Sequence, residues 1–236
     1  MRYAVPMTDG ELKRIPRLLE KEYPNSRDEN DFQLRVHIEK GVPTGQPAAE
    51  VSGRGSRMLS ANDQRIVVTR QASVMYACLA PYPGWDDFSN GAHFVFDSLR
   101  EKLGYREVSS IGLRYVNRID VPLKDDGPPL LPTDYLLVGV AWPPNGITTS
   151  LRAFQTVAEI EINHDQLFAR VSAATAVETL IRHASLLFDI DVIAQADLPK
   201  KSDEFWALVG RMRDAKNSIF ESGVTDAARQ LFGAQP

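Results

Sequence analysis

Two arginines and two aspartates are spaced so that each pair lies on one face of an extended strand. Arg114 and Arg118 are four residues apart, and Asp189 and Asp191 are two residues apart. Because side chains alternate between the faces of a strand, both spacings keep the members of a pair together. A guanidinium group binds a carboxylate through two parallel hydrogen bonds. We therefore expect these four residues, the Arg/Asp cluster, to form an ion-pair network between two halves of the fold.

Three roles are open to the Arg/Asp cluster. As a structural network it would fix the register of the strands and dock the two halves. Because a buried ion pair is weak evidence for stability, the arginines could instead hold a phosphate or carboxylate group of a small ligand. Asp189 and Asp191 could also clamp a metal ion, but two carboxylates are too few to define a magnesium or calcium site. The sequence predicts no metal centre.

The strand that carries the arginines alternates over residues 110–120. Tyr115 and Asn117 share a face with the apolar residues of this run. Buried polar groups need hydrogen-bond partners. These two side chains therefore either line a pocket or, as we favour, bridge neighbouring strands. The candidate site for a ligand or an ion-pair network comprises Arg114, Tyr115, Asn117, Arg118, Asp189 and Asp191.

Other residues of catalytic type lack the spacing that their chemistry requires. The histidines belong to no His-Glu-x-x-His or Cys/His pattern, and we expect them to be surface or hydrogen-bonded side chains. Cys78 is expected to pack as a small apolar side chain. No nucleophile elbow or P-loop is present, although the basic glycine segment 53–57 is a weak candidate for phosphate contact. We predict no catalytic residue and no cofactor.

The charge balance argues against a general nucleic-acid binder. The 236 residues carry a formal net charge of −4, and the sequence pI is about 5.6. Nucleic-acid-binding domains usually present a basic face and have a high pI. A local contact through Arg54, Arg57, Arg65 and Arg70 stays open, but the acidic balance disfavours it.

The sequence also indicates a compartment. A single cysteine excludes an internal disulfide framework and fits a reducing environment. The first residues lack the apolar segment of a signal peptide. The longest uncharged stretch, residues 135–151, is interrupted by prolines and a glycine, so it does not read as a membrane span. We expect a cytoplasmic protein without membrane association.

Periodicity predicts the elements of the first half. A helix capped by Asp9 and interrupted at Pro16 is followed by a strand over residues 32–38. Residues 40–57 are rich in Gly, Pro, Ala and Ser, which predicts a loop. Strands over residues 65–70 and 73–79 precede a helix over residues 85–103, whose apolar residues recur every three or four positions.

The second half repeats this plan loosely. Residues 122–133 are rich in proline and form the clearest connector, and Thr133 can cap a short helix through Val140. Three strands follow, over residues 152–162, 167–173 and 185–194, with a turn at residues 163–165. A long helix over residues 203–221, capped by Ser202 or Asp203, precedes a short helix capped by Thr225.

Sequential strands with few helices predict an α+β fold with antiparallel pairing. We expect a single globular unit over residues 1–236, built from pseudo-halves 1–121 and 134–236 that are joined by the connector 122–133. Each pseudo-half would carry a few strands and one long amphipathic helix packed on the sheet.

Several segments resemble one bacterial family of unknown function that is sporadically distributed. The family's hallmark strand reads R-I-G-L-R-Y-I-N-R-I, and residues 111–119 are similar to it, with Ser110 in place of the first Arg. Its P-Y-x-x-W-x-x-F helix entry, L-D-I-D strand and K-x-x-F-E-x-x-I-T segment resemble residues 81–88, 187–192 and 216–225. The family usually opens with a longer apolar strand than residues 1–8. The resemblance implies no established activity, and the patchy distribution suggests defence or mobile elements.

The sequence thus favours a non-catalytic binding or accessory protein, with a protein partner whose identity is unknown. The alternative is an enzyme or sensor that binds a phosphate- or carboxylate-bearing ligand at the Arg/Asp cluster. Nucleic acid is the least favoured partner.

Overall fold

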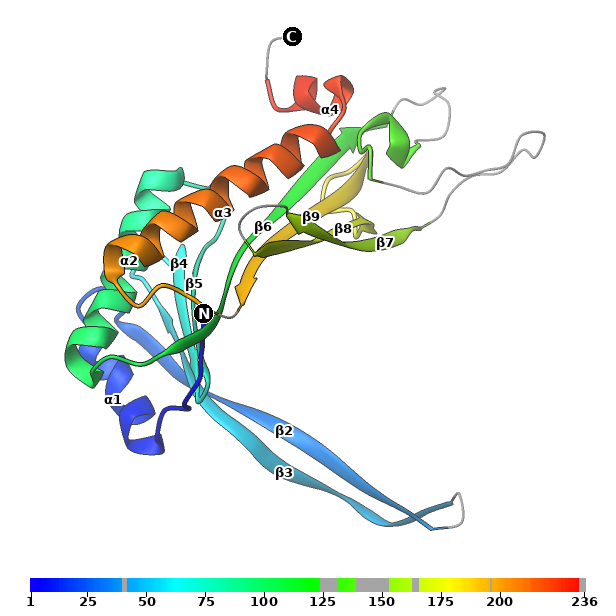
Figure 1. Ribbon diagram of the computed structural model, residues 1–236. Helices are drawn as coiled ribbons and strands as arrows, with labels where there is room; N and C mark the ends of the chain where they lie inside the picture. Colours follow the sequence, from blue (N-terminus) through cyan, green and yellow to red (C-terminus); the bar gives the residue numbers. More distant parts are fainter. Residues whose placement is uncertain (40–41, 124–130, 139–152, 163–165, 196, 234–236) are drawn as a thin grey trace. The chain divides into compact units, whose positions relative to one another are not determined.

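The computed structural model describes residues 1–39, 42–123, 131–138, 153–162, 166–195 and 197–233, with the side chains of residues 31–52 left out. These residues form an α+β fold with four α-helices and nine strands, hydrogen bonded in the order β2-β3-β4-β5-β1-β6-β9-β8-β7 (Figure 1). The chain divides into two compact units, unit 1 (Met1–Ser109) and unit 2 (Ser110–Pro236). No helix in the described ranges combines the length and apolarity needed to span a membrane.

Unit 1 holds five antiparallel strands in the order β2-β3-β4-β5-β1. Their bounds are β1 (Arg2–Tyr3), β2 (Asn25–Glu39), β3 (Val42–Leu59), β4 (Arg65–Arg70) and β5 (Ser73–Cys78). The predicted strands at residues 65–70 and 73–79 match β4 and β5. β3 pairs with β4 only over residues 55–59, so the rest of β2 and β3 continues as a two-stranded ribbon (Figure 1).

The predicted loop over residues 40–57 is wrong, because most of it forms β3. Its backbone pairs with β2 along the ribbon, with register shifts after Asp31 and Arg35 of β2. Pro47 lies among the β3 residues that skip pairing at the second shift, where the missing N–H costs no ladder bond. The composition suggested a loop, but the β2 partner supplies the hydrogen bonds that make it a strand.

Two helices complete unit 1. α1 (Asp9–Leu19) packs near α2 (Trp85–Leu103), and α2 lies against β5. The cap of α1 is Thr8 and not the predicted Asp9: the Thr8 hydroxyl accepts from the amide of Glu11, whose carboxylate accepts from the amide of Thr8. The predicted interruption at Pro16 is wrong, because α1 runs as one helix from Asp9 to Leu19 with Pro16 inside it.

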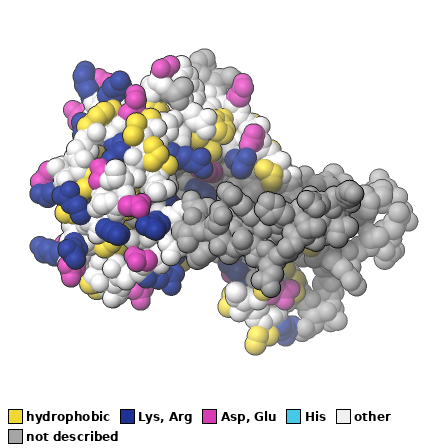
Figure 2. Space-filling model, turned by 90° about the horizontal axis from the view of Figure 1, so that it is seen from below, with side chains coloured by type: hydrophobic (Ala, Val, Ile, Leu, Met, Phe, Trp, Pro, Cys, Tyr) yellow, Lys and Arg dark blue, Asp and Glu magenta, His cyan; other side chains and the backbone are white. Residues whose placement is uncertain are grey.

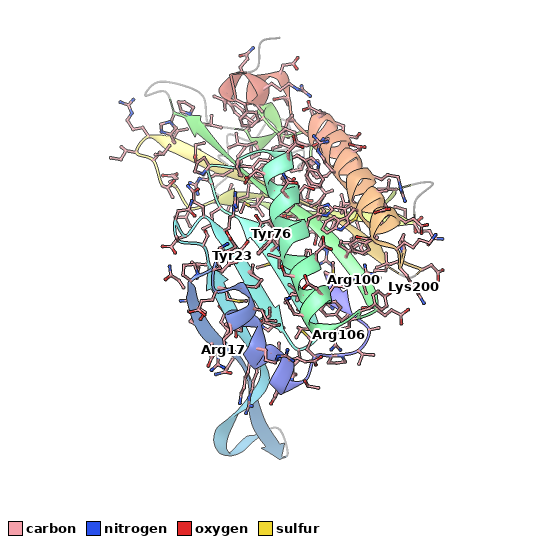
Figure 3. The ribbon with its side chains drawn as sticks, turned by 90° about the vertical axis from the view of Figure 1, so that its left-hand side faces the viewer. Arg17, Tyr23, Tyr76, Arg100, Arg106 and Lys200 are labelled. Carbon is pink, nitrogen blue, oxygen red and sulfur yellow. The ribbon has the colours of Figure 1, made fainter. Side chains whose placement is uncertain are left out.

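The core of unit 1 contains two neighbouring phenols. Tyr23 and Tyr76 lie close together beside α2, whose C-terminal end carries Arg100 and leads to Arg106 (Figure 3). Burial raises the pKa of Tyr23 to about 12 and also raises the pKa of Tyr76. The Tyr76 hydroxyl lies 3.3 Å from the Cys78 sulfur, which is half-buried.

Unit 2 holds four antiparallel strands in the order β6-β9-β8-β7, and β6 starts just before the boundary of the unit. Their bounds are β6 (Val108–Pro122), β7 (Gln155–Ile162), β8 (Leu167–Ala176) and β9 (His183–Gln195). The predicted strand positions agree with these bounds to within a few residues. The predicted turn at residues 163–165 lies outside the described residues.

The helices of unit 2 are α3 (Ser202–Gly223) and α4 (Asp226–Leu231). α3 lies against β9, where Phe188 stacks on Phe220 with ring centroids 6.0 Å apart. The Thr225 cap of α4 is confirmed, since its hydroxyl accepts from the Ala228 amide. The predicted caps of α3 are wrong, because the N-cap is Lys201 and makes no side-chain bond.

Two further sequence expectations concern the middle of the chain. In place of the predicted helix from Thr133, a 3-10 turn, η1 (Pro132–Asp134), is followed by an isolated bridge between Leu136 and Val224. The boundary between the two compact units falls after Ser109, inside β6. Part of that connector lies outside the described residues, and the division into repeated pseudo-halves stays a prediction.

Candidate functional site: the open face of the unit 2 sheet

The alternation predicted for β6 is confirmed by burial. Ile111, Leu113 and Ile119 are buried, whereas Arg114 and Val116 are exposed. Phe188 of β9 and Phe220 of α3 stack on the buried side. The opposite side, which we call the open face, carries the arginines of β6 and the residues of neighbouring strands that lie opposite them in the strand register.

The register assembles an alternating row of charges across all four strands of the open face. Arg114 of β6 lies opposite Asp191 of β9, Asp191 lies opposite Arg170 of β8, and Arg170 lies opposite Glu159 of β7. We call these four residues the charge row. Neighbouring side chains on one sheet face are close enough to interact, and opposite charges there are favourable.

Arg114 does not bind the aspartate directly opposite. Its Nε lies 2.9 and 3.1 Å from the two Asp189 oxygens, and its Nη2 lies 2.5 Å from Oδ2, so the pair is bidentate and diagonal. Asp189 raises the pKa of Arg114 through these hydrogen bonds. The predicted pairing of this arginine with the β9 aspartates is thus present, with Asp189 as the partner.

Arg118 does not join this pair, so the predicted four-residue network is wrong. Its Nε lies 2.9 Å from Asp120 Oδ1 on the same strand, and its Nη2 donates to Ser185 Oγ and to the Val177 carbonyl, at 2.6 and 2.8 Å. Asp120 also accepts from the Ser185 hydroxyl, which together with Arg118 lowers its pKa. A carboxylate two residues away reaches the guanidinium more directly than one on the next strand.

Asp191 is left unmatched in the charge row. Its Oδ1 is buried and has no hydrogen-bond partner among the described residues. Burial raises the pKa of this carboxyl, with Arg114 opposing the shift and Asp189 adding to it. A Cβ placed on Gly112 would lie 3.0 Å from Oδ1, so the glycine leaves room for the carboxyl group. A buried carboxyl without a donor requires an explanation.

The second arginine beside Asp191 is also bound elsewhere. Arg170 Nε and Nη2 donate to Glu159 Oε1, at 3.0 and 2.7 Å. Sequence reasoning missed both residues. The available signals were a single charge in the apolar strand of Arg170 and alternating glutamates in β7, but placing them beside Asp191 requires the register between the strands.

Tyr115 and Asn117 lie on the other side of the sheet. Asn117 Nδ2 donates to the Phe188 carbonyl at 3.0 Å, which bridges neighbouring strands as expected. The Lys216 ammonium lies 4.0 Å from the centre of the Tyr115 ring, and burial lowers the pKa of this lysine. The six predicted site residues therefore occupy two faces of the sheet.

All six residues belong to unit 2. The Arg/Asp cluster was expected between the pseudo-halves 1–121 and 134–236, and the pair of Arg114 and Asp189 joins a residue of each, on β6 and β9 of unit 2. Within the described ranges, no group of three His, Cys, Asp or Glu residues is placed to hold a metal ion.

The arginines considered for nucleic acid are bound to carboxylates of unit 1. Arg54 pairs with Asp9 at 2.9 Å, and Arg65 with Asp87 at 2.7 Å. Glu29 accepts from both Arg57 and Arg70, and the bond from Arg57 is the main cause of its lowered pKa. On the face seen in Figure 2, basic and acidic side chains are interspersed over the described residues. These contacts give the nucleic-acid hypothesis no support.

No family model matches the chain, and no curated protein or solved structure is significantly similar to it. The resemblance of residues 81–88, 111–119, 187–192 and 216–225 to one bacterial family therefore stays a prediction.

Proposed function

We propose that the chain is a non-catalytic binding protein that receives a basic protein partner on the open face of unit 2. The observation that carries this proposal is Asp191, a carboxyl with a buried oxygen that lacks a donor among the described residues although it lies between two arginines. Arg114 and Arg170 both bind other carboxylates. A cationic or N–H donor from a partner would complete the charge row at this point.

The charge of the open face supports a basic partner. Three arginines (Arg114, Arg118 and Arg170) share the face with five acids (Asp120, Asp189, Asp191, Glu159 and Glu161), so the formal sum is +3 − 5 = −2. Complementary charge steers the approach of a partner and fixes its orientation.

Apolar side chains on the same face give the partner surface to bury. Val116 of β6 and Val157 of β7 are 57% and 54% exposed. They lie at the two ends of a row of facing residues that crosses the four strands, with Asp189 and Ser172 between them. Protein interfaces combine apolar contact with a polar surround, and an exposed apolar patch beside charges fits such a surface.

The alternative, a site for a small phosphate or carboxylate ligand, gains no support from the same contacts. A bound anion would need guanidinium donors, and Arg114 and Arg118 already bind Asp189 and Asp120. Binding such a ligand would require breaking an ion pair and leaving a carboxylate unpaired.

Photo-crosslinking in the native host tests the proposal. A photoreactive amino acid at Val116 should yield a discrete adduct with another protein, while the same probe at exposed Ala227 of α4 should not. With the captured partner purified, Asp191→Asn should weaken its binding roughly tenfold, the loss of one charge-assisted contact. The conservative control is Glu161→Gln, at the outer strand of the same face.

Two results would contradict the proposal. One is the same set of adducts from both probe positions, which would mean that contact is not specific to the open face. The other is equal affinity of the partner for the wild-type chain and for Asp191→Asn, measured by calorimetry.

A further inference from the structure

The outer edge of β2 runs along a ribbon that is too thin to be stable alone. β2 is the terminal strand in the strand order, so one of its edges has no described strand beside it. Away from residues 55–59, β3 pairs with β2 only, which leaves two strands without a described third. An isolated two-stranded ribbon is marginally stable in water, and three or more strands are needed for independent stability.

The outer edge of β2 is regular. At the two register shifts the additional residues belong to β3: Ser52 at the first, and residues 45–47 against Val36 at the second. β2 itself therefore runs without an inserted residue. Bulges on an edge strand normally obstruct pairing with another chain. This edge lacks that protection among the described residues.

The sequence of β2 is that of a half-buried strand. Phe32, Leu34, Val36 and Ile38 occupy alternate positions, and the positions between them are polar, namely Gln33, Arg35 and His37. Alternation with period two places the apolar positions on one face of an extended strand. A further strand beside β2 would extend this apolar face.

We infer that the occupant of this edge is β2 of a second copy of the chain, paired antiparallel about a two-fold axis at Gln33. The numbers of any two residues that face each other, one in each copy, would then add up to 66. Asp31 of each copy would lie opposite Arg35 of the other, and Arg27 opposite Glu39. Each pairing occurs twice by symmetry, which gives four pairs of opposite charge and no pair of like charge over residues 27–39.

Neighbouring registers are less complementary. An even sum is needed to keep the apolar positions of both copies on one face. A sum of 68 places Glu29 opposite Glu39, and a sum of 64 leaves Glu29 with Arg35 as the one pairing of an acid with an arginine. The charges of β2 thus select the register centred on Gln33.

The ribbon residues 30–54 carry three acids and three basic side chains of Lys or Arg, so they offer no net attraction to nucleic acid.

A pair of charge reversals tests both the second copy and the register. In a homodimer, Asp31→Lys would place two basic residues opposite each other at this pairing, and Arg35→Glu would place two acidic ones there. Each variant alone should dimerise roughly tenfold more weakly than the wild-type chain, because two attractions become two repulsions. Mixed in equal amounts, the two variants should form a heterodimer in which the two copies again pair opposite charges at these positions.

Sedimentation velocity of the full chain gives the measurement, with a mass of twice 26.3 kDa expected for the wild-type protein. Arg17→Glu, a reversal at an exposed position of α1, is the control and should leave dimerisation unchanged. A wild-type chain that is monomeric at every concentration overturns the inference, as does a mixture of the two reversals that fails to associate more strongly than either alone.

A crosslink distinguishes this register from any other dimer. In a Cys78→Ser background, Gln33→Cys should form a disulfide-linked dimer on mild oxidation, since the two positions would face each other across the axis. Asp28→Cys, roughly 30 Å from its copy in this register, should not. Equal crosslinking at both positions would overturn the proposed axis.

Discussion

The contact between α3 and β9 depends on a glycine, and a single methyl group tests it. A Cβ added to Gly223 would lie 2.4 Å from Cζ and 2.8 Å from Cε1 of Phe188. Phe188 is fully buried and is stacked on Phe220, so the ring has little room to move. The backbone of Gly223 has no positive φ, so the expected cost of Gly223→Ala is steric.

The magnitude follows from overpacking. Inserting a methyl group into a well-packed core costs about 1–3 kcal/mol. Gly210, on the same helix, provides the matched control, because nothing lies within 4 Å of an added Cβ there. Gly210→Ala should raise the free energy of unfolding by about 0.5–1 kcal/mol, since alanine is favoured over glycine inside a helix. The two substitutions should therefore differ in sign.

Urea unfolding followed by circular dichroism measures both effects. In a thermal melt, a loss of about 2 kcal/mol in the free energy of unfolding lowers the melting temperature of a chain of this size by roughly 4–8 °C. Adding Phe188→Leu to Gly223→Ala should recover part of the loss, with a coupling energy of about 1 kcal/mol or more. Equal effects at both glycines, or no coupling to Phe188, would refute the close contact between this end of α3 and β9.

Four other predictions concern single contacts. Gly91→Ala should destabilise unit 1 because its Cβ would lie 2.1 Å from the Tyr76 hydroxyl, and Tyr76→Phe should relieve this loss in a thermal melt. Glu29→Gln should lower the free energy of unfolding by about 0.5–1 kcal/mol at pH 7; because the pKa of Glu29 is lowered from 4.5 by Arg57 and Arg70, the difference should vanish as pH falls well below 4.5. Asp191→Asn should have the opposite pH dependence. The pKa of Asp191 is raised from 3.8, so the folded state binds more protons than the unfolded state and the free energy of unfolding falls as pH rises through the raised pKa. The amide should remove that fall, as measured by urea titrations from about pH 3 to 7. Arg114→Ala should cost less than about 1 kcal/mol, because the arginine is 61% exposed, and a larger loss in a urea melt would show that the ion pair holds the sheet.

Local patterns were sufficient for the elements that carry their own periodicity. α2 begins and ends at the predicted residues because its apolar positions recur at helical spacing and Gly104, with a positive φ, ends it. β4 and β5 were likewise predicted from the pattern of their own residues. β3 was missed because residues 42–59 are rich in Gly, Pro, Ala and Ser, and the hydrogen bonds that make them a strand come from pairing with β2.

The faces of β6 could be predicted, but the partners of its charges could not. Alternation alone separated Arg114 from Tyr115, and burial agrees with it. Which carboxylate each arginine binds depends on register and on competition among neighbours within reach. Arg118 has Asp120 on its own strand and Ser185 close by, so it does not need the β9 aspartates.

The same competition explains why Asp191 is the residue left over. Arg114 lies opposite Asp191 in register, but its bidentate contact with Asp189 uses Nε and Nη2 together. Arg170 faces Asp191 in register yet binds Glu159, which lies nearer the solvent-exposed edge of the sheet. An exposed carboxylate keeps its charge at little cost, whereas a half-buried one loses hydration when it ionises. Both arginines are thus held by other carboxylates, and Asp191 Oδ1 is left without a donor among the described residues.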